Sequence, residues 1–160
     1  MVKYTNSMVT FREFPDEISL CIDISGCPNH CKGCHSPWLW EDTGTELTIE
    51  ELDRLIQAND GISCIGFMGG DQDPEYINNL AKHVKANYSI KTGWYSGKHD
   101  LSTKMDWSLW DYIKLGPYIE EKGGLDNPNT NQRMYCFTPK NIHSWPKDIT
   151  YKFWKNDSNS

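Results

Sequence analysis

The chain has 160 residues, of which 38% are hydrophobic and 24% charged, and its formal net charge is −6. These values predict an ordinary soluble protein in which residues 1–160 form a single domain with a substantial core. The acidic balance lacks the basic stripe that neutralises a phosphate backbone, so we expect no nucleic acid partner. Residues 1–15 contain no apolar signal segment and no later run is long enough to span a bilayer, so we expect a cytoplasmic protein and no membrane partner.

The first predicted element is a strand over residues 18–24, a short run rich in β-forming residues. Three cysteines, Cys27, Cys31 and Cys34, follow it within eight residues. Their CxxxCxxC spacing allows three thiolates to converge on one metal centre from a single loop. The stretch 25–47 is also too long for a simple connection in a compact domain, and such loops are usually functional. The spacing therefore indicates a metal-binding loop.

More than one metal chemistry fits three cysteines. A structural zinc site normally has four protein ligands, so zinc here would need His30, His35 or a distant group. An iron–sulfur cluster held by three cysteines leaves one iron without a protein ligand, where a substrate can bind. We favour an iron–sulfur centre in an enzyme, with structural zinc and a catalytic thiol as alternatives. The other cysteines lie in apolar stretches and are predicted to be buried small hydrophobes: Cys21, Cys64 and Cys136.

Two helices are predicted from their start signals. Thr48 and Glu51 form a capping box, with Thr48 as N-cap and Glu51 reaching back to it. Asp73 supplies the second N-cap and Pro74 a first-turn proline. The residues predicted to face the core follow helical spacing: Leu52, Leu55 and Ile56 in the first helix, and Ile77, Leu80, Ala81 and Val84 in the second.

Further strands are predicted over residues 62–68, 90–95, 112–115 and 149–154. Because strands alternate with helices, we expect right-handed crossovers and a mostly parallel sheet. The chain is too short for eight strand–helix units. We therefore predict an α/β fold, a partial, open TIM-like β/α barrel.

Four segments follow the carboxyl ends of predicted strands: the cysteine loop, Gly69-Gly70-Asp71, Ser96-Gly97 and Gly116-Pro117. In parallel α/β sheets ligands bind at this edge, so these segments predict one binding rim. The Ser96 hydroxyl fits a ligand contact and a turn hydrogen bond equally well. For Lys114, a charge on the rim is one interpretation and a solvated side chain the simpler one. Three histidines are interpreted as surface or packing residues: His83, His99 and His143.

The cysteine loop after one strand, together with a glycine pair after the next, resembles the radical S-adenosylmethionine (SAM) enzymes. In that superfamily three cysteines hold a 4Fe–4S cluster, and the amino and carboxylate groups of SAM chelate the fourth iron. The resemblance implies that Cys27, Cys31 and Cys34 hold such a cluster here. SAM would then occupy the open iron position.

Within that superfamily the chain is similar to the activating proteins of the anaerobic (class III) ribonucleoside-triphosphate reductases. Four segments carry this similarity and span most of the chain: residues 25–35, 68–71, 115–119 and 131–133. The chain departs from the family pattern where Gln72 and Asp73 precede Pro74. It departs again at Leu115, where many members have an acidic residue before Gly-Pro.

The resemblance also implies SAM contacts for individual residues. Gly33 and His35 flank the last cysteine and would lie along the adenine or ribose of SAM. Gly69 and Gly70 would offer backbone groups to its amino group. Asp71, which stands where the superfamily often has glutamate, and Ser96 complete the expected contacts. The cofactor-binding set is therefore Gly33, Cys34, His35, Gly69, Gly70, Asp71 and Ser96, and contact with SAM or the partner protein is implied for Asn131, Gln132 and Arg133.

The implied reaction begins when a reduced cluster donates one electron to SAM and cleaves its sulfur–carbon bond. The 5′-deoxyadenosyl radical takes a hydrogen atom from a glycine of the large reductase subunit, which retains a glycyl radical. Cluster and SAM carry this chemistry, so no side chain is expected to act as a catalytic acid or base. A flavodoxin or ferredoxin would supply the electron. Activation of another glycyl-radical enzyme, a small substrate, and a zinc-stabilised binding module are the alternatives.

Overall fold

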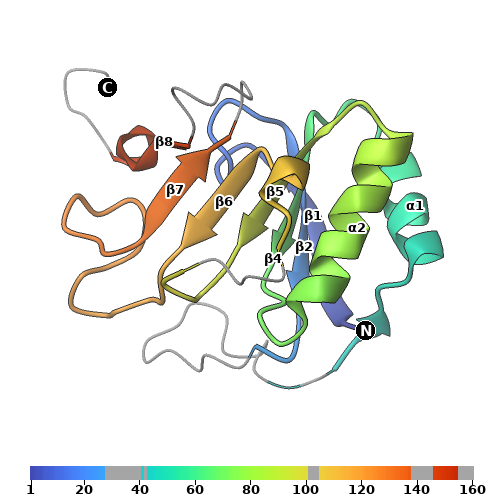
Figure 1. The fold of residues 1–160 in the computed structure, drawn as a ribbon, viewed down its shortest axis with the longest axis horizontal. Coiled ribbons are helices and arrows are strands. Elements are labelled where there is room, and N and C mark those ends of the chain that lie inside the picture. Colours follow the sequence, from blue (N-terminus) through green and yellow to red (C-terminus); the bar gives the residue numbers. More distant parts are fainter. Residues whose placement is uncertain (28–40, 42, 101–104, 138–145, 155–160) are drawn as a thin grey trace.

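The computed structural model describes residues 1–27, 41, 43–100, 105–137 and 146–154. Across these ranges eight strands form one sheet in the order β3-β1-β2-β4-β5-β6-β7-β8, and two α-helices cover one of its faces (Figure 1). The strands are β1 Lys3–Thr10, β2 Ser19–Ile24, β3 Thr45–Glu46, β4 Cys64–Met68, β5 Lys91–Tyr95, β6 Tyr112–Leu115, β7 Arg133–Cys136 and β8 Lys147–Asp148.

The centre and the margins of the sheet differ in strand direction. Strands β2, β4, β5 and β6 are mutually parallel, as alternating strands and helices predict. The outer pairs β1–β2, β1–β3, β6–β7 and β7–β8 are antiparallel, so the sheet as a whole is mixed and the expected mostly parallel sheet is confined to its centre. Strand β1 reaches β2 through residues 11–18, which is shorter than a parallel crossover requires. The barrel-like closure stays a prediction.

Helix α1, Ile49–Gln57, begins at its predicted cap. The Thr48 hydroxyl oxygen accepts a hydrogen bond from the Glu51 amide at 3.0 Å. The Glu51 carboxylate, expected to complete the capping box, instead accepts hydrogen bonds from Tyr4 on β1, at 2.9 Å, and from Arg54. The apolar face of the helix is buried as predicted, at Leu52, Leu55 and Ile56.

Helix α2, Pro74–Asn87, also follows its prediction. The Asp73 carboxylate caps it by accepting from the Tyr76 amide at 3.3 Å, and Pro74 occupies the first turn. Both helices lie on the same side of the sheet in Figure 1. The core between them and the sheet includes the predicted α2 residues Ile77, Leu80, Ala81 and Val84. Neither helix, nor any other among the described residues, is long and apolar enough to cross a bilayer.

The opposite side of the sheet, which we call the helix-free face, is covered by the β1–β2 connection. The fully buried Phe14 ring lies over two glycines of adjacent strands: a Cβ on Gly66 or on Gly93 would sit 2.3 Å from a ring carbon. The rings of Tyr95 and Tyr112 pack around it with centroid distances of 5.2 and 5.7 Å. The predicted buried cysteines Cys21 and Cys64 belong to this cluster, whereas Cys136 is only half-buried.

The predicted strand over residues 149–154 is wrong. The chain forms the short strand β8 and then a 3₁₀ helix over Thr150–Phe153. The Asp148 carboxylate explains the turn, because one of its oxygens accepts from the Thr150 amide at 3.0 Å and from the Thr150 hydroxyl at 2.6 Å. Such local side-chain hydrogen bonds compete with continued strand pairing.

Candidate functional site

The predicted cluster ligands begin where β2 ends. Cys27 lies just beyond that strand and is partly exposed, while Cys31, Gly33, Cys34 and His35 lie outside the described residues. Within the described ranges no group of three or more His, Cys, Asp or Glu side chains could hold a metal ion. A metal centre at this position therefore depends on the remainder of the cysteine loop.

The approach to Cys27 is held in place by backbone and side-chain hydrogen bonds. The buried Ser25 hydroxyl donates to the carbonyl oxygen of Thr43 at 2.5 Å, and the Gly26 amide donates to that of Glu41 at 2.9 Å. The Gln72 side-chain amide donates to the Ser25 carbonyl at 2.7 Å and so joins this exit to the turn after β4. Sequence reasoning treated Gln72 only as a departure from the family pattern and missed this bridge.

The glycine pair after β4 is required by the backbone. Gly69 and Gly70 have φ values of +112° and +101°, a region that side chains disfavour. A Cβ on Gly70 would also lie 2.6 Å from the Ile77 side chain. The Gly69 amide donates to the backbone carbonyl oxygen of Tyr95 at 3.0 Å, and the Gly69 carbonyl oxygen accepts from the Trp94 indole at 2.7 Å. That carbonyl oxygen has a second lone pair with which to accept from a ligand.

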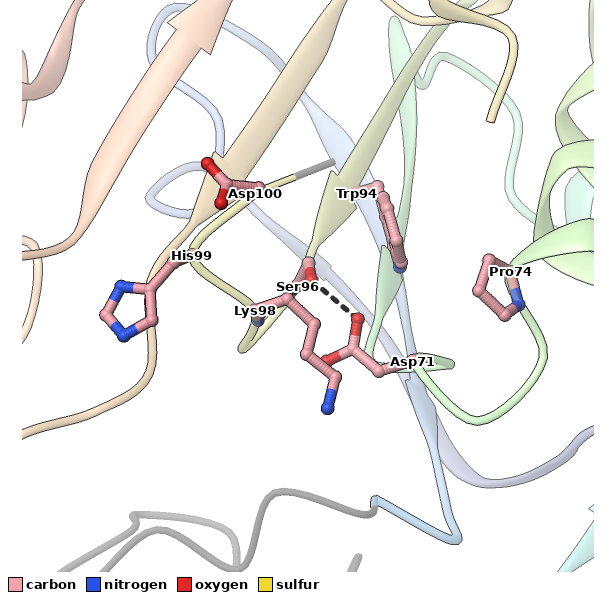
Figure 2. A pocket seen from close by; sticks show the side chains of 7 residues that line it. All are labelled: Asp71, Pro74, Trp94, Ser96, Lys98, His99 and Asp100. Carbon is pink, nitrogen blue, oxygen red and sulfur yellow. Dashed lines mark hydrogen bonds between the residues drawn. The ribbon is translucent and has the colours of Figure 1, made fainter. Parts of the chain in front are cut away.

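Asp71 and Ser96, predicted to meet at the rim, do so directly (Figure 2). The Ser96 hydroxyl donates to one Asp71 carboxylate oxygen at 2.5 Å, and the Gly97 amide donates to the other at 2.8 Å. The Ser96 oxygen also accepts from the Lys98 amide at 3.1 Å, so the serine makes the turn hydrogen bond as well. The turns after β4 and β5 are thus joined through one carboxylate.

A cavity of about 410 Å³ opens beside this pair. Figure 2 shows that its walls come from the start of α2, from β5 and from the segment after β5. His99 contributes to it, which the interpretation of that histidine as a surface or packing residue did not anticipate. The residues that line the cavity are Asp71, Pro74, Trp94, Ser96, Lys98, His99 and Asp100.

Lys114 is buried, so its interpretation as a solvated side chain is wrong. It is 8% exposed and lies on the helix-free face, beside Tyr95 in the sheet register. Its ammonium group donates to the carbonyl oxygens of Ser96, at 2.9 Å, and Gly116, at 3.0 Å, and lies 5.6 Å from the centre of the Tyr95 ring. The turns after β5 and β6 therefore share one cation.

The Asn-Gln-Arg segment is divided between two surroundings. The Asn131 side-chain amide donates to the Pro117 carbonyl at 3.1 Å, and that of Gln132 to the Gly116 carbonyl at 3.4 Å. Both side chains therefore attach to the rim. Arg133 begins β7 and lies 3.7 Å from the Asp148 carboxylate of β8, which places it in an ion pair outside the rim.

The electrostatics of the helix-free face are dominated by burial. Burial raises the pKa of Asp23, which pairs in register with Met68 near the carboxyl ends of the strands. It also raises the pKa of Glu13 in the β1–β2 connection. The Tyr95 hydroxyl donates to the Glu13 carbonyl oxygen, and burial raises the pKa of this phenol well above its ordinary value. Tyr95 is thus tied to the β1–β2 connection.

Comparison with known proteins gives a match to a protein family. A family model described as a 4Fe-4S single cluster domain matches residues 18–115. This range starts beside β2, contains the whole cysteine loop and both α-helices, and ends with the last residue of β6. No curated protein and no solved structure matches the chain. Because the matched range covers more than half of its length, the chain belongs to the 4Fe-4S single cluster domain family of iron–sulfur proteins.

Proposed function

We propose that the chain is an iron–sulfur activase that reductively cleaves SAM and generates a glycyl radical on the anaerobic ribonucleotide reductase. One observation carries the proposal. The turns after β4, β5 and β6 are hydrogen-bonded to one another at the carboxyl edge of the parallel strands, and β2 delivers Cys27 to the same edge. Ligands of parallel α/β sheets and barrels bind at this edge.

The family membership supports the first part of the site. Cys27, Cys31 and Cys34 would hold the 4Fe–4S cluster, and Gly33 and His35 would lie beside the SAM nucleoside. When bound and reduced, the cluster would supply one electron for cleavage of a sulfur–carbon bond of SAM, which would release methionine and an adenosyl radical able to take a hydrogen atom from a glycine Cα of the partner. A flavodoxin or ferredoxin would supply the electron that reduces the cluster again.

The described residues fit SAM, which carries a cationic sulfonium and ammonium group. The carbonyls of Gly69 and Gly70 each accept one internal hydrogen bond and have a lone pair for the ammonium. The Asp71 carboxylate faces the cavity and supplies negative charge. The cavity volume of about 410 Å³ also falls within the range of small-molecule sites.

The contribution of this chain is to bind and orient its ligands. Asp71 and Ser96 fix each other across two turns, and Trp94 holds the Gly69 carbonyl that would face the ammonium. On the helix-free face Phe14 fills the space over the middle of the sheet. A ligand would therefore approach the site from the carboxyl edge, where a segment of the large reductase subunit can reach it. We propose the partial β/α barrel as the scaffold of this arrangement.

The test uses the full-length chain purified and reconstituted without oxygen. Iron and acid-labile sulfide in the ratio of a 4Fe–4S cluster are expected, and zinc without sulfide would identify a zinc-stabilised binding module instead. The reduced protein should cleave SAM to methionine and 5′-deoxyadenosine. With the anaerobic reductase added, electron paramagnetic resonance should show a glycyl-radical doublet. SAM cleavage without that doublet would assign the chemistry to another glycyl-radical enzyme or a small substrate.

A further inference from the structure

Lys114 is a buried cation that donates hydrogen bonds to backbone carbonyls of two rim turns. Its ammonium contacts the carbonyl oxygens of Ser96 and Gly116, which are themselves buried residues. A neutral side chain of similar length, such as methionine, would pack in the same space but donate no hydrogen bond. The Ser96 carbonyl would then lose the lysine donor, and the Gly116 carbonyl would keep the longer hydrogen bond from Gln132 at 3.4 Å. Buried carbonyl oxygens that lose a donor are costly, so the ammonium stabilises both turns.

The contacts of Lys114 continue into a network that joins four segments. From Ser96 it extends to Asp71 after β4, since the Ser96 hydroxyl and the Gly97 amide both donate to that carboxylate. From Gly116 it extends to Gln132 before β7, whose side chain donates to the same carbonyl oxygen. We call the six residues of this network the rim network: Asp71, Ser96, Gly97, Lys114, Gly116 and Gln132. Lys114 is the member that links its two halves.

The backbone around Lys114 leaves little freedom for other arrangements. Gly116 has a φ of +108°, and a Cβ there would lie 3.1 Å from the Gln132 Cα. The Ser96 amide donates to the Lys114 carbonyl at 2.9 Å, and the Gly116 amide donates to that of Lys98 at 2.7 Å. The two turns are therefore held close together, and the ammonium lies where their carbonyls converge.

We propose that Lys114 is a positioning residue that holds the Ser96–Gly97 turn against the Gly116–Pro117 turn and thereby fixes Asp71 and Ser96 for SAM. The SAM-dependent part of this inference rests on the proposed function. The positioning itself is a property of the chain and can be measured without any cofactor. Lys114 acts here through its neighbours and takes no part in bond cleavage.

The first experiment measures hydrogen exchange in cluster-free protein, comparing wild type with Lys114→Met. Peptides covering residues 96–98 and 116–118 should exchange faster in the variant, while peptides from α1 and α2 should not change. The matched control is Lys91→Met, because Lys91 lies on the same face at the other end of β5 and binds Glu17 at 2.8 Å. In that variant the rim peptides should exchange as in wild type. Unchanged rim exchange in Lys114→Met would overturn the proposal.

The second experiment titrates SAM into the reduced, cluster-loaded proteins and follows the electron paramagnetic resonance signal of the cluster. Lys114→Met should show the wild-type signal without SAM and need about tenfold more SAM to change it, the effect expected for losing a charge-assisted hydrogen bond. Lys91→Met should titrate as wild type does. If wild type itself shows no SAM response, the proposed function fails while the exchange experiment still decides the positioning role. Equal SAM affinity in wild type and Lys114→Met overturns the SAM-dependent part.

A second variant covers the case in which Lys114→Met does not fold. Lys114→Gln keeps amide donors on a shorter side chain and removes the charge, so it reaches the two carbonyls less well. It should give faster rim exchange and weaker SAM binding than wild type. Wild-type behaviour in both measurements would overturn the proposal.

Discussion

The two ends of the central strands use polar groups in opposite ways. At the amino end, the buried Glu17 carboxylate accepts hydrogen bonds from Ser63 at 2.8 Å, Lys91 at 2.8 Å and Tyr112 at 2.6 Å. These donors precede or belong to β4, β5 and β6. Glu17 therefore fills this end with internal contacts, and the Phe14 ring packs next to it over the middle of the strands.

At the carboxyl end, the rim network joins the turns after the same three strands but borders an open cavity. Asp71 is held by Ser96 and Gly97 and also lines that cavity. The amino ends of these strands therefore stabilise the fold, whereas their carboxyl ends border the candidate ligand site. Changes at the amino end should affect folding, and changes at the carboxyl end should affect ligand binding.

The largest expected effect is the loss of the cluster in Cys27→Ala. Removing one of three thiolates should abolish 4Fe–4S assembly, because the remaining two cysteines cannot retain it. Iron and sulfide analysis after anaerobic reconstitution measures this, and circular dichroism should show an unchanged fold. Cys21→Ala is the matched control, since Cys21 is buried on the preceding strand and should leave the cluster intact. A full cluster in Cys27→Ala would remove this residue from the ligand set.

The next largest effect is expected from Phe14→Ala, because this ring packs over the middle of β4 and β5. Deleting this fully buried ring leaves a cavity over Gly66 and Gly93, which should lower the free energy of unfolding by about 3–5 kcal/mol. Urea denaturation of the cluster-free protein measures it, with the 70% exposed Phe11 changed to alanine as a control of small effect. The folded fraction should still bind SAM with wild-type affinity. Weaker SAM binding by that folded fraction would contradict the separation of internal packing from ligand binding.

A smaller effect is expected from Asp71→Asn at the carboxyl end. The asparagine offers one acceptor to Ser96 and Gly97 where the carboxylate offers two, and it removes the negative charge beside the cavity. SAM affinity should fall about tenfold, as measured by titration of the loaded protein. Asp73→Asn is the control, because this neighbouring carboxylate caps α2 and pairs with the N-terminal ammonium at 2.7 Å but does not line the cavity. Equal SAM affinity in all three proteins would remove Asp71 from the site.

The smallest effect is a pH dependence that arises from two partly buried carboxyl groups on the helix-free face, Glu13 and Asp23. Burial raises the pKa values of Glu13 and Asp23 above their ordinary values of 4.5 and 3.8. The folded chain therefore holds protons that the unfolded chain has released, and the stability from these groups is complete below the ordinary values and declines as pH rises through the raised ones. The double variant Glu13→Gln, Asp23→Asn should show a flatter decline in a pH series of denaturation curves. An identical pH dependence in wild type would contradict this assignment.

Much of the parallel centre could be predicted from the sequence because several local signals agree there. The predicted strand over residues 112–115 coincides with β6, and the caps at Thr48 and Asp73 start the two helices. Each central strand is a short run that contains apolar or aromatic residues and is followed by glycine or serine, and burial of most of its residues explains that pattern. The same pattern placed Asp71 and Ser96 at one edge, where the structure joins them.

The margins could not be predicted, since their signals are not local. Strand β1 is largely exposed and shows no regular alternation, and β7 begins inside a polar segment that reads as a loop. Their pairing with β2 and β6 determines both strands. The burial of Lys114 could not be predicted for a similar reason. It donates to backbone carbonyls, and the residue types in the sequence do not indicate which carbonyls lie near it.

The Phe14 ring has a consequence for where a stable fragment of this chain can begin. The family match starts at residue 18, after both Phe14 and Glu17. A fragment cut at that boundary would leave two glycines of the sheet uncovered, and it would separate Lys91 and Tyr112 from their shared carboxylate. A fragment limited to the matched range should therefore be less stable than one that also includes Phe14 and Glu17.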